Sequence, residues 1–93
     1  MKYRLILTSK FKRSLKLAKK RGLNISLLED IVNNLQMDIP LPEKNCDHEL
    51  KGNFKGFREC HIQPNWLLVY LKENEKLTLT LIDTGTHSDI FDM

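Results

Sequence analysis

The chain has 93 residues, of which 41% are hydrophobic and 29% charged, with a formal net charge of +3. This size predicts one small globular domain over residues 1–93, and no run of roughly 18 apolar residues suggests a membrane span. No apolar signal core follows the basic start, so we expect a cytoplasmic protein. Cys46 and Cys60 form no C-x-x-C pair, and we expect reduced thiols that pack as small apolar side chains.

The positive charge is concentrated at the start of the chain. Residues 1–21 carry nine Lys and Arg and no acid, whereas residues 22–93 carry six bases and twelve acids. Such a segment attracts polyanions over long distances. Contact with nucleic acid and a merely solvated helix face both fit this pattern, and the charge alone does not decide between them.

The first elements are predicted to be a short strand and two helices. Tyr3–Leu7 alternates as a strand does, and Ser9 is the expected N-cap of a first helix that ends at Gly22. The apolar stripe of this helix comprises Phe11, Leu15 and Ala18. For the second helix, Asn24 precedes the pattern Ser26-x-x-Glu29, which fits a capping box. Its stripe comprises Leu27, Leu28, Ile31, Val32 and Leu35, and the short connection predicts an antiparallel helix hairpin.

The second half of the chain reads as strands. Residues 38–45, which contain two prolines, are expected to form a loop, and Glu49–Phe54 a modest strand. From residue 57 the side chains alternate, which predicts one face with Phe57, Glu59 and His61 and another with Arg58, Cys60 and Ile62. A turn at residues 63–65 then leads into Trp66–Leu71, an apolar run typical of a central strand.

The chain is predicted to end with one more strand and a helical turn. The strand at residues 77–82 would direct Leu77, Leu79 and Leu81 to the core and end before Gly85. Thr86-x-x-Asp89 resembles a capping box that opens a short helix, in which His87 and Phe91 are neighbours on one face.

This order of elements predicts an α+β fold. Two N-terminal helices would cover one face of a mostly antiparallel sheet, with a short helix at the C-terminal end. By strand parity the other face carries Glu59 and His61, and His87 can fold back beside them.

All three histidines (His48, His61 and His87) lie in the second half of the chain, and any one of them taken alone has an ordinary structural explanation. Their spacing matches no compact zinc motif, so we expect no metal. General acid–base catalysis suits them better, because an unperturbed histidine has a pKa of about 6.5 and exchanges protons near neutral pH.

Nearby cations, namely Lys51, Lys55 and Arg58, are candidates to hold a phosphate. Together with two proton-transfer groups, they would meet the needs of metal-free RNA cleavage, in which the ribose 2′-OH attacks the adjacent phosphorus. Composition and periodicity do not establish this reaction by themselves.

Three segments resemble the YafQ branch of the RelE/ParE toxin superfamily, and the resemblance extends over essentially the whole chain. They are D-H-E-L-K-G at 47–52, G-F-R-E-C-H-I-Q-P-N-W-L-L-V-Y at 56–70 and T-G-T-H-S-D-I-F at 84–91. The resemblance implies a RelE/ParE-like fold and a type II toxin: a ribosome-dependent mRNA endoribonuclease without metal or other cofactor. It also implies binding in the ribosomal A site, contact of basic surface with ribosomal RNA, and neutralisation by a small antitoxin of the DinJ/RelB kind.

The resemblance also assigns site residues. His48, His61 and His87 match the active-site histidines of the family, and Phe91 matches an aromatic that stacks on or orients the substrate. Glu59 matches an acidic position of some members.

Other positions have plainer alternatives. Trp66 follows the position of the catalytic carboxylate of the family, but it and Phe91 also suit simple packing. Lys51 and Lys55 also fit as plain solvated charges.

Two departures from the family pattern bear on catalysis. Asn65 stands where the family usually has aspartate, and an amide positions a group but accepts no proton. Asp83 stands where an arginine is frequent, and losing one charge-stabilising group costs roughly 10²–10³ in rate. We therefore expect a weaker or differently arranged nuclease in which His61, His87 or Glu59 acts as base and Arg58 or a lysine supplies the cation. The alternative is a toxin that acts by binding alone, on the ribosome or, as in the ParE branch, on gyrase.

Overall fold

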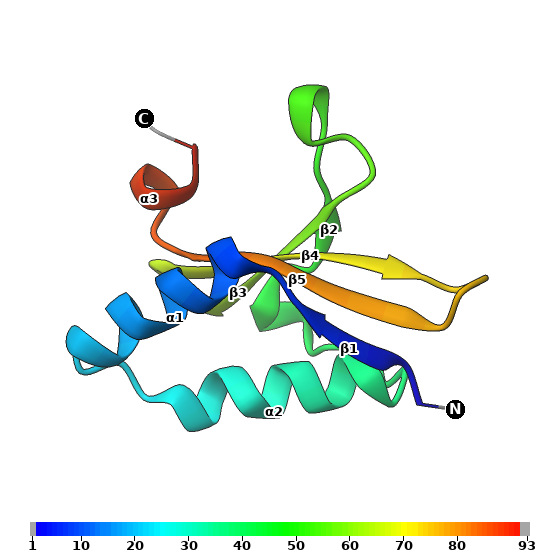
Figure 1. Cartoon of the computed structure of the whole chain (residues 1–93), viewed down its shortest axis with the longest axis horizontal. Helices are drawn as coiled ribbons and strands as arrows, with labels where there is room; N and C mark the ends of the chain where they lie inside the picture. The colour runs from blue at the N-terminus through cyan, green and yellow to red at the C-terminus, as the bar shows by residue number, and fades with distance from the viewer. Residues whose placement is uncertain (1, 92–93) are drawn as a thin grey trace.

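The computed structural model describes residues 2–91 and consists of a five-stranded sheet with helices on both of its faces (Figure 1). The elements in chain order are β1 (Arg4–Leu7), α1 (Ser9–Lys20), α2 (Ile25–Gln36), η1 (Glu43–Asn45), β2 (His48–Glu49), η2 (Gly52–Phe54), β3 (Arg58–Gln63), β4 (Trp66–Glu73), β5 (Thr78–Gly85) and α3 (His87–Phe91). The strands are ordered β1-β5-β4-β3-β2, and only the β1–β5 pair is parallel. The predicted α+β fold is confirmed.

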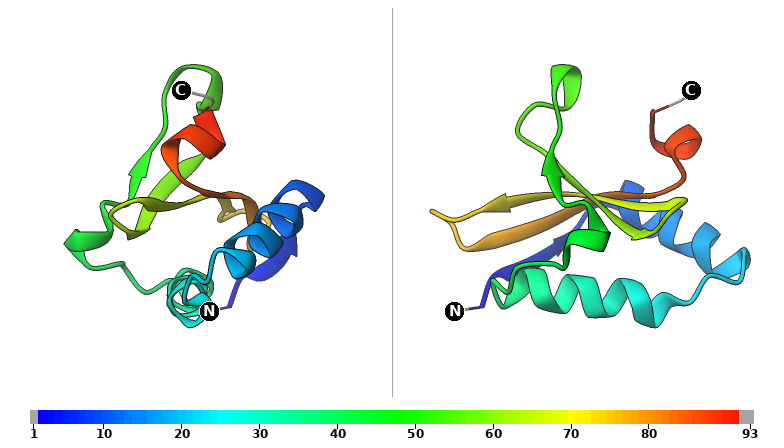
Figure 2. Two further views of the ribbon diagram at one scale, coloured as in Figure 1. Left: turned by 90° about the vertical axis from the view of Figure 1, so that its left-hand side faces the viewer. Right: turned by 180° about the vertical axis from the view of Figure 1, so that it is seen from behind.

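The main core lies between the sheet and the two long helices. α1 and α2 pack on one face, while α3 and the segment around η2 stand on the other (Figures 1 and 2). Phe11 and Ala18 of α1 are buried in this core, as is the predicted stripe of α2 apart from the partly buried Leu27. No helix within residues 2–91 is both long enough and apolar enough to cross a bilayer.

The helix caps differ from the predicted ones by one or two residues. Thr8, not Ser9, is the N-cap of α1, and its hydroxyl accepts from the Phe11 N–H at 3.1 Å. Asn24 caps α2 by accepting from the Ser26 N–H, so Ser26 lies inside the helix and forms no capping box with Glu29. The sequence did not identify the right N-cap because Thr8 and Ser9, like Asn24 and Ser26, all have a side-chain oxygen that can accept from a backbone N–H.

Two strand predictions also need correction. Residues 49–54 do not form one strand, because β2 ends at Glu49 and Gly52, with φ of 66°, starts the 3₁₀ turn η2. Leu77 does not face the core: it has a φ of 52°, belongs to the turn before β5 and is 37% exposed. Leu79 and Leu81 are buried as predicted.

A second, smaller apolar cluster lies on the sheet face away from α1 and α2. It is built around Leu67, Val69 and Ile90. Phe57 and Phe91 pack at its margin. Because Ile90 belongs to α3, this cluster seats the C-terminal helix on the face that carries the candidate site.

Candidate active site

Glu59 lies between two imidazoles on this face. Strand alternation directs Glu59 and His61 of β3 to the same side, and the β2–β3 register sets His48 opposite Glu59. The Nε2 atoms of His48 and His61 each lie 3.6 Å from Oε1 of Glu59. The carboxylate is almost fully buried, whereas the His48 side chain is 50% exposed and that of His61 23%. A proton taken up by either ring would therefore face a carboxylate with little water around it.

The orientation of the His48 ring is fixed by the backbone. Its Nδ1 lies 2.6 Å from the carbonyl oxygen of Cys46, a residue in the left-handed conformation at the end of η1. A carbonyl only accepts hydrogen bonds, so Nδ1 carries the proton in the neutral ring and Nε2 is free to accept one. The nitrogen with the open lone pair is the one that faces Glu59.

Asn45 supports His61 from the edge of the sheet. β3 extends past β2, which pairs only with Arg58 and Glu59. Beyond that point the Asn45 side chain donates from Nδ2 to the backbone oxygen of His61 at 2.7 Å. Asn45 is 6% exposed, and the sequence analysis missed it because nothing in a proline-containing loop marks a contact with a strand 16 residues away.

The C-terminal helix brings in the third imidazole. The ring centroids of His61 and His87 are 6.1 Å apart, and those of His87 and Phe91 are 5.8 Å apart. The Thr86–Asp89 capping box is confirmed: the Thr86 N–H donates to the Asp89 carboxylate and the Asp89 N–H donates to the Thr86 hydroxyl. His48, His61 and His87 thus converge on the face free of α1 and α2, as the sequence predicted.

Arg21 ties this helix to the end of α1. Its guanidinium donates to both carboxylate oxygens of Asp89, at 2.7 and 3.4 Å, and joins segments 68 residues apart. The hydrogen bonds from Arg21 and from the backbone of Thr86 lower the pKa of Asp89 to about 2. The start of α3, where His87 sits, is therefore held by an ion pair as well as by its own cap.

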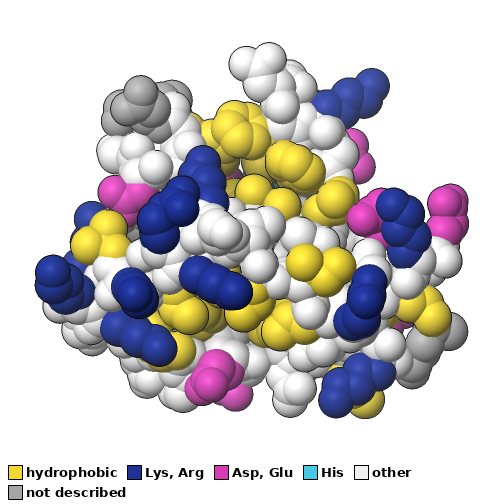
Figure 3. All heavy atoms as spheres, in the orientation of Figure 1, with side chains coloured by type: hydrophobic (Ala, Val, Ile, Leu, Met, Phe, Trp, Pro, Cys, Tyr) yellow, Lys and Arg dark blue, Asp and Glu magenta, His cyan; other side chains and the backbone are white. Residues whose placement is uncertain are grey.

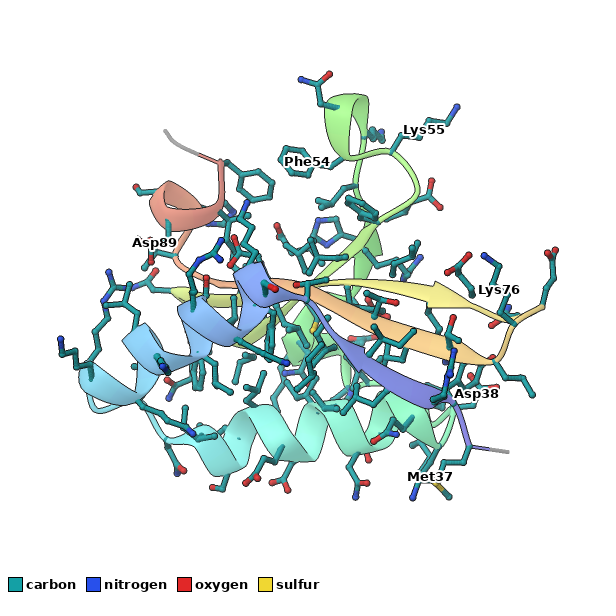
Figure 4. All side chains as sticks on the ribbon, in the orientation of Figure 1. Met37, Asp38, Phe54, Lys55, Lys76 and Asp89 are labelled. Carbon is teal, nitrogen blue, oxygen red and sulfur yellow. The ribbon has the colours of Figure 1, made fainter. Side chains whose placement is uncertain are left out.

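The predicted phosphate-binding residues are less well placed. Arg58 points to the opposite face of β3, where its Nε donates to Asp47 at 3.3 Å and where Asp38 and Tyr70 line the same small pocket. Arg58 and His61 are three residues apart along β3, an odd spacing that puts them on opposite faces, so they are not placed to bind one phosphate. Lys51 and Lys55 are exposed around η2, and Lys55 extends into solvent (Figure 4).

Asp83 lies beneath α1 and is 3% exposed. Its carboxylate accepts hydrogen bonds from the Ser14 hydroxyl and the Thr84 N–H and pairs with Lys10 at 3.6 Å. The anion that replaces the family's arginine is thus engaged by α1 and held away from solvent.

Asn65 and Trp66 lie at the turn between β3 and β4. Trp66 is 3% exposed, belongs to the main core and donates from Nε1 to Thr84, so packing accounts for it. Asn65 is exposed, and both residues line a pocket of about 420 Å³ together with Arg21 and Thr86. The structure therefore separates Asn65 and Trp66 from the Glu59 cluster without removing them from the vicinity of α3.

Potential metal ligands do not gather into a site in the described part of the chain. Over residues 2–91, no group of three or more His, Cys, Asp and Glu side chains is arranged to hold an ion. Cys46 and Cys60 are both free, the first exposed and the second buried, and burial raises the pKa of the Cys60 thiol to about 12.

Known proteins are similar to this chain in both sequence and fold. Residues 3–92 match the family described as bacterial toxin of type II toxin-antitoxin system, YafQ. The mRNA interferase toxin YafQ of Escherichia coli K12 is 36% identical over 85 residues, which is 90% of either chain.

Among solved structures, a metal-bound toxin from Helicobacter pylori is 42% identical, with a TM-score of 0.90 over 96% of this chain and 99% of that one. The E. coli DinJ–YafQ toxin–antitoxin complex contains a chain that is 30% identical, with a TM-score of 0.88 over 98% of this chain and 99% of that one. The chain belongs to the YafQ family of type II toxin–antitoxin toxins.

Proposed function

We propose that this chain is the toxin of a type II toxin–antitoxin system and that it inhibits translation by cutting mRNA on the ribosome. Its E. coli relative is named an mRNA interferase toxin. The observation that carries the proposal is the row of His48, Glu59, His61 and His87 on one face of the sheet.

His61 and His87 would take the two proton-transfer roles. Oε1 of Glu59 lies 3.6 Å from Nε2 of His61, and with the ring proton on that nitrogen Nδ1 of the same ring would accept the proton of the ribose 2′-OH. The 2′-oxygen then attacks phosphorus, and His87 protonates the departing 5′-oxygen from the other side. With their ring centroids 6.1 Å apart, the two imidazoles are close enough to contact the same phosphate. Each such group contributes roughly 10²–10⁴-fold.

His48 would stabilise charge instead. When protonated it would donate from Nδ1 to the Cys46 carbonyl and present Nε2–H towards Glu59, so its positive charge would be fixed on the face that carries His61. This cation stands in for the arginine that Asp83 replaces, since Arg58 lies on the wrong face. Proton transfer and charge stabilisation then come from side chains alone, without a metal step.

The basic N-terminal segment would hold the RNA. Lys and Arg side chains gather over α1 (Figure 3), with six in the helix and Arg21 at its C-cap. All seven are exposed, and contacts of this kind release counterions from phosphates. We expect the affinity for ribosomes to fall as salt rises, and an affinity independent of salt would remove this role.

The enzyme is tested by cell-free translation with the purified chain, followed by primer extension on the message. The wild type should give discrete cuts, and His61→Gln or His87→Gln should reduce them by at least about 10²-fold. Arg58→Gln is the matched control, because it removes a charge from the same strand on the opposite face and should leave the cuts in place. Equal cleavage by the His87→Gln variant would contradict the assignment.

The second candidate is a toxin that binds without cutting. It is favoured by Asn65 and by Asp83, which remove a base and a cation that the family pattern supplies. Blocked translation with intact message would support it, and gyrase-dependent DNA breaks with normal translation would point to the ParE mode.

An antitoxin is the expected partner. The E. coli YafQ structure includes one, DinJ. In this chain β1 is an edge strand with Leu5, Ile6 and Leu7 each more than one-third exposed, a surface that suits an added strand or helix. Co-expression with the neighbouring reading frame should yield a complex.

A further inference from the structure

The loop between β2 and β3 holds an aromatic ring that the core does not use. Phe54 is half-buried, and its ring centroid lies 5.0 Å from that of Phe91 at an interplanar angle of 84° (Figure 4). Within residues 2–91, the apolar cluster of this face includes Phe57 and Phe91 but not Phe54. Packing of the sheet therefore gives no reason for a phenylalanine at this position.

The loop presents this ring in a fixed position. Gly52 and Gly56 adopt φ values of 66° and 96°, which glycine tolerates without strain. The Phe54 N–H donates to the Lys51 carbonyl at 3.3 Å, and the Lys55 N–H donates to the Gly52 carbonyl at 3.1 Å. These turns and the contact with Phe91 place the ring before a ligand binds, which lowers the entropy cost of binding.

Phe54 extends the row of rings that forms the candidate active site. The order along this face is Phe54, Phe91, His87 and His61, with centroid separations of 5.0, 5.8 and 6.1 Å. In an edge-to-face pair, the ring that contributes its edge keeps both faces clear of its partner. One of the two phenylalanines therefore has both faces clear of the other, and Phe91 places the pair next to His87.

We propose that Phe54 and Phe91 together form the stacking platform for the nucleobase next to the scissile phosphate. The inference rests on the proposed RNA-cleaving function and adds Phe54 to the residues that contact the substrate. Single-stranded RNA is commonly held by aromatic rings that stack on unpaired bases, with basic side chains on the backbone. Here Lys51 and Lys55 lie on either side of Phe54 in the sequence and are exposed, and Lys55 points away from the ring into solvent (Figure 4).

The experiment compares Phe54 variants that differ in aromaticity. The probe is an RNA oligonucleotide with 2′-O-methyl groups, which cannot be cut through the 2′-OH. Its affinity for each protein is measured with the oligonucleotide free in solution and again with it bound as the message on ribosomes. Phe54→Ala and Phe54→Leu should both bind roughly 5- to 150-fold more weakly than wild type, because stacking needs a π face. Phe54→Tyr should bind like wild type. With an oligonucleotide that lacks the base beside the scissile position, all four proteins should bind alike.

Melting temperatures and cleavage separate the possible failures. If Phe54→Leu has a lower Tm but binds the oligonucleotide as tightly as wild type, Phe54 only supports Phe91 by packing, and the inference is overturned. If wild type cleaves RNA and the binding series is flat, the inference fails while the proposed function stands. If no RNA is cut but affinity still follows aromaticity, the nuclease fails and the stacking platform stands.

Discussion

Replacing Asn45 tests whether the edge of β3 is held as the structure indicates. Asn45→Asp keeps the shape of the side chain but removes the N–H donor that binds the His61 carbonyl at 2.7 Å. A buried acceptor left without its donor costs about 1–3 kcal/mol, and the side chain here is 6% exposed. For a domain of this size, each kcal/mol corresponds to about 4–8 °C in Tm.

The expected result is a drop in unfolding free energy of about 1–3 kcal/mol in urea, with an unchanged slope. Asn45→Ala should lower the unfolding free energy by a similar amount, because it also removes the donor. Cleavage by Asn45→Asp should show a lower kcat with little change in KM, since His61 rather than RNA binding is disturbed. A variant as stable and as active as wild type would refute the reasoning and leave His61 positioned by strand pairing alone.

Three further outcomes are expected. Because the pKa of Asp89 is lowered in the folded state, its ion pair and cap stabilise the protein fully above about pH 4, and this stabilisation is lost as the pH falls through about 2. The difference in Tm between wild type and Asp89→Asn should therefore shrink over that pH range. Thr8→Ala should cost about 0.5–2 kcal/mol in urea unfolding and Ser9→Ala much less, since only Thr8 caps α1. A thiol reagent at pH 8 should modify Cys46 in the native state and reach Cys60 only after unfolding, because burial raises the Cys60 pKa to about 12; equal rates, read by mass spectrometry, would contradict this.

Strand periodicity predicted most of what places the candidate site. Alternation along β3 was enough to separate Glu59 and His61 from Arg58, yet Arg58 was still counted among the phosphate-binding cations, and the structure shows that prediction to be wrong. The capping pattern located α3 and therefore His87. Such local patterns are readable because each follows from the geometry of one element.

The contacts between elements were not readable in the same way. Nothing near Asn45 announces a hydrogen bond to His61, and nothing in the basic segment singles out Arg21 as the partner of Asp89. The sequence placed Phe54 in a strand, so it did not predict that the Phe54 ring packs against the Phe91 ring. These contacts depend on where distant backbones meet, which a single sequence does not encode in any one stretch.

The brevity of β2 has a consequence for how the protein loses activity. The ladder of β2 with β3 consists of His48–Glu59 and Glu49–Arg58, followed by one hydrogen bond from the Leu50 N–H to the Phe57 carbonyl, so little backbone pairing fixes the distance between the first imidazole and the carboxylate. A segment with so few hydrogen bonds opens at a small fraction of the global unfolding free energy. Amide protons of this segment should exchange with deuterium long before those of β4 and β5, and warming should inactivate the toxin while its circular dichroism spectrum is still native.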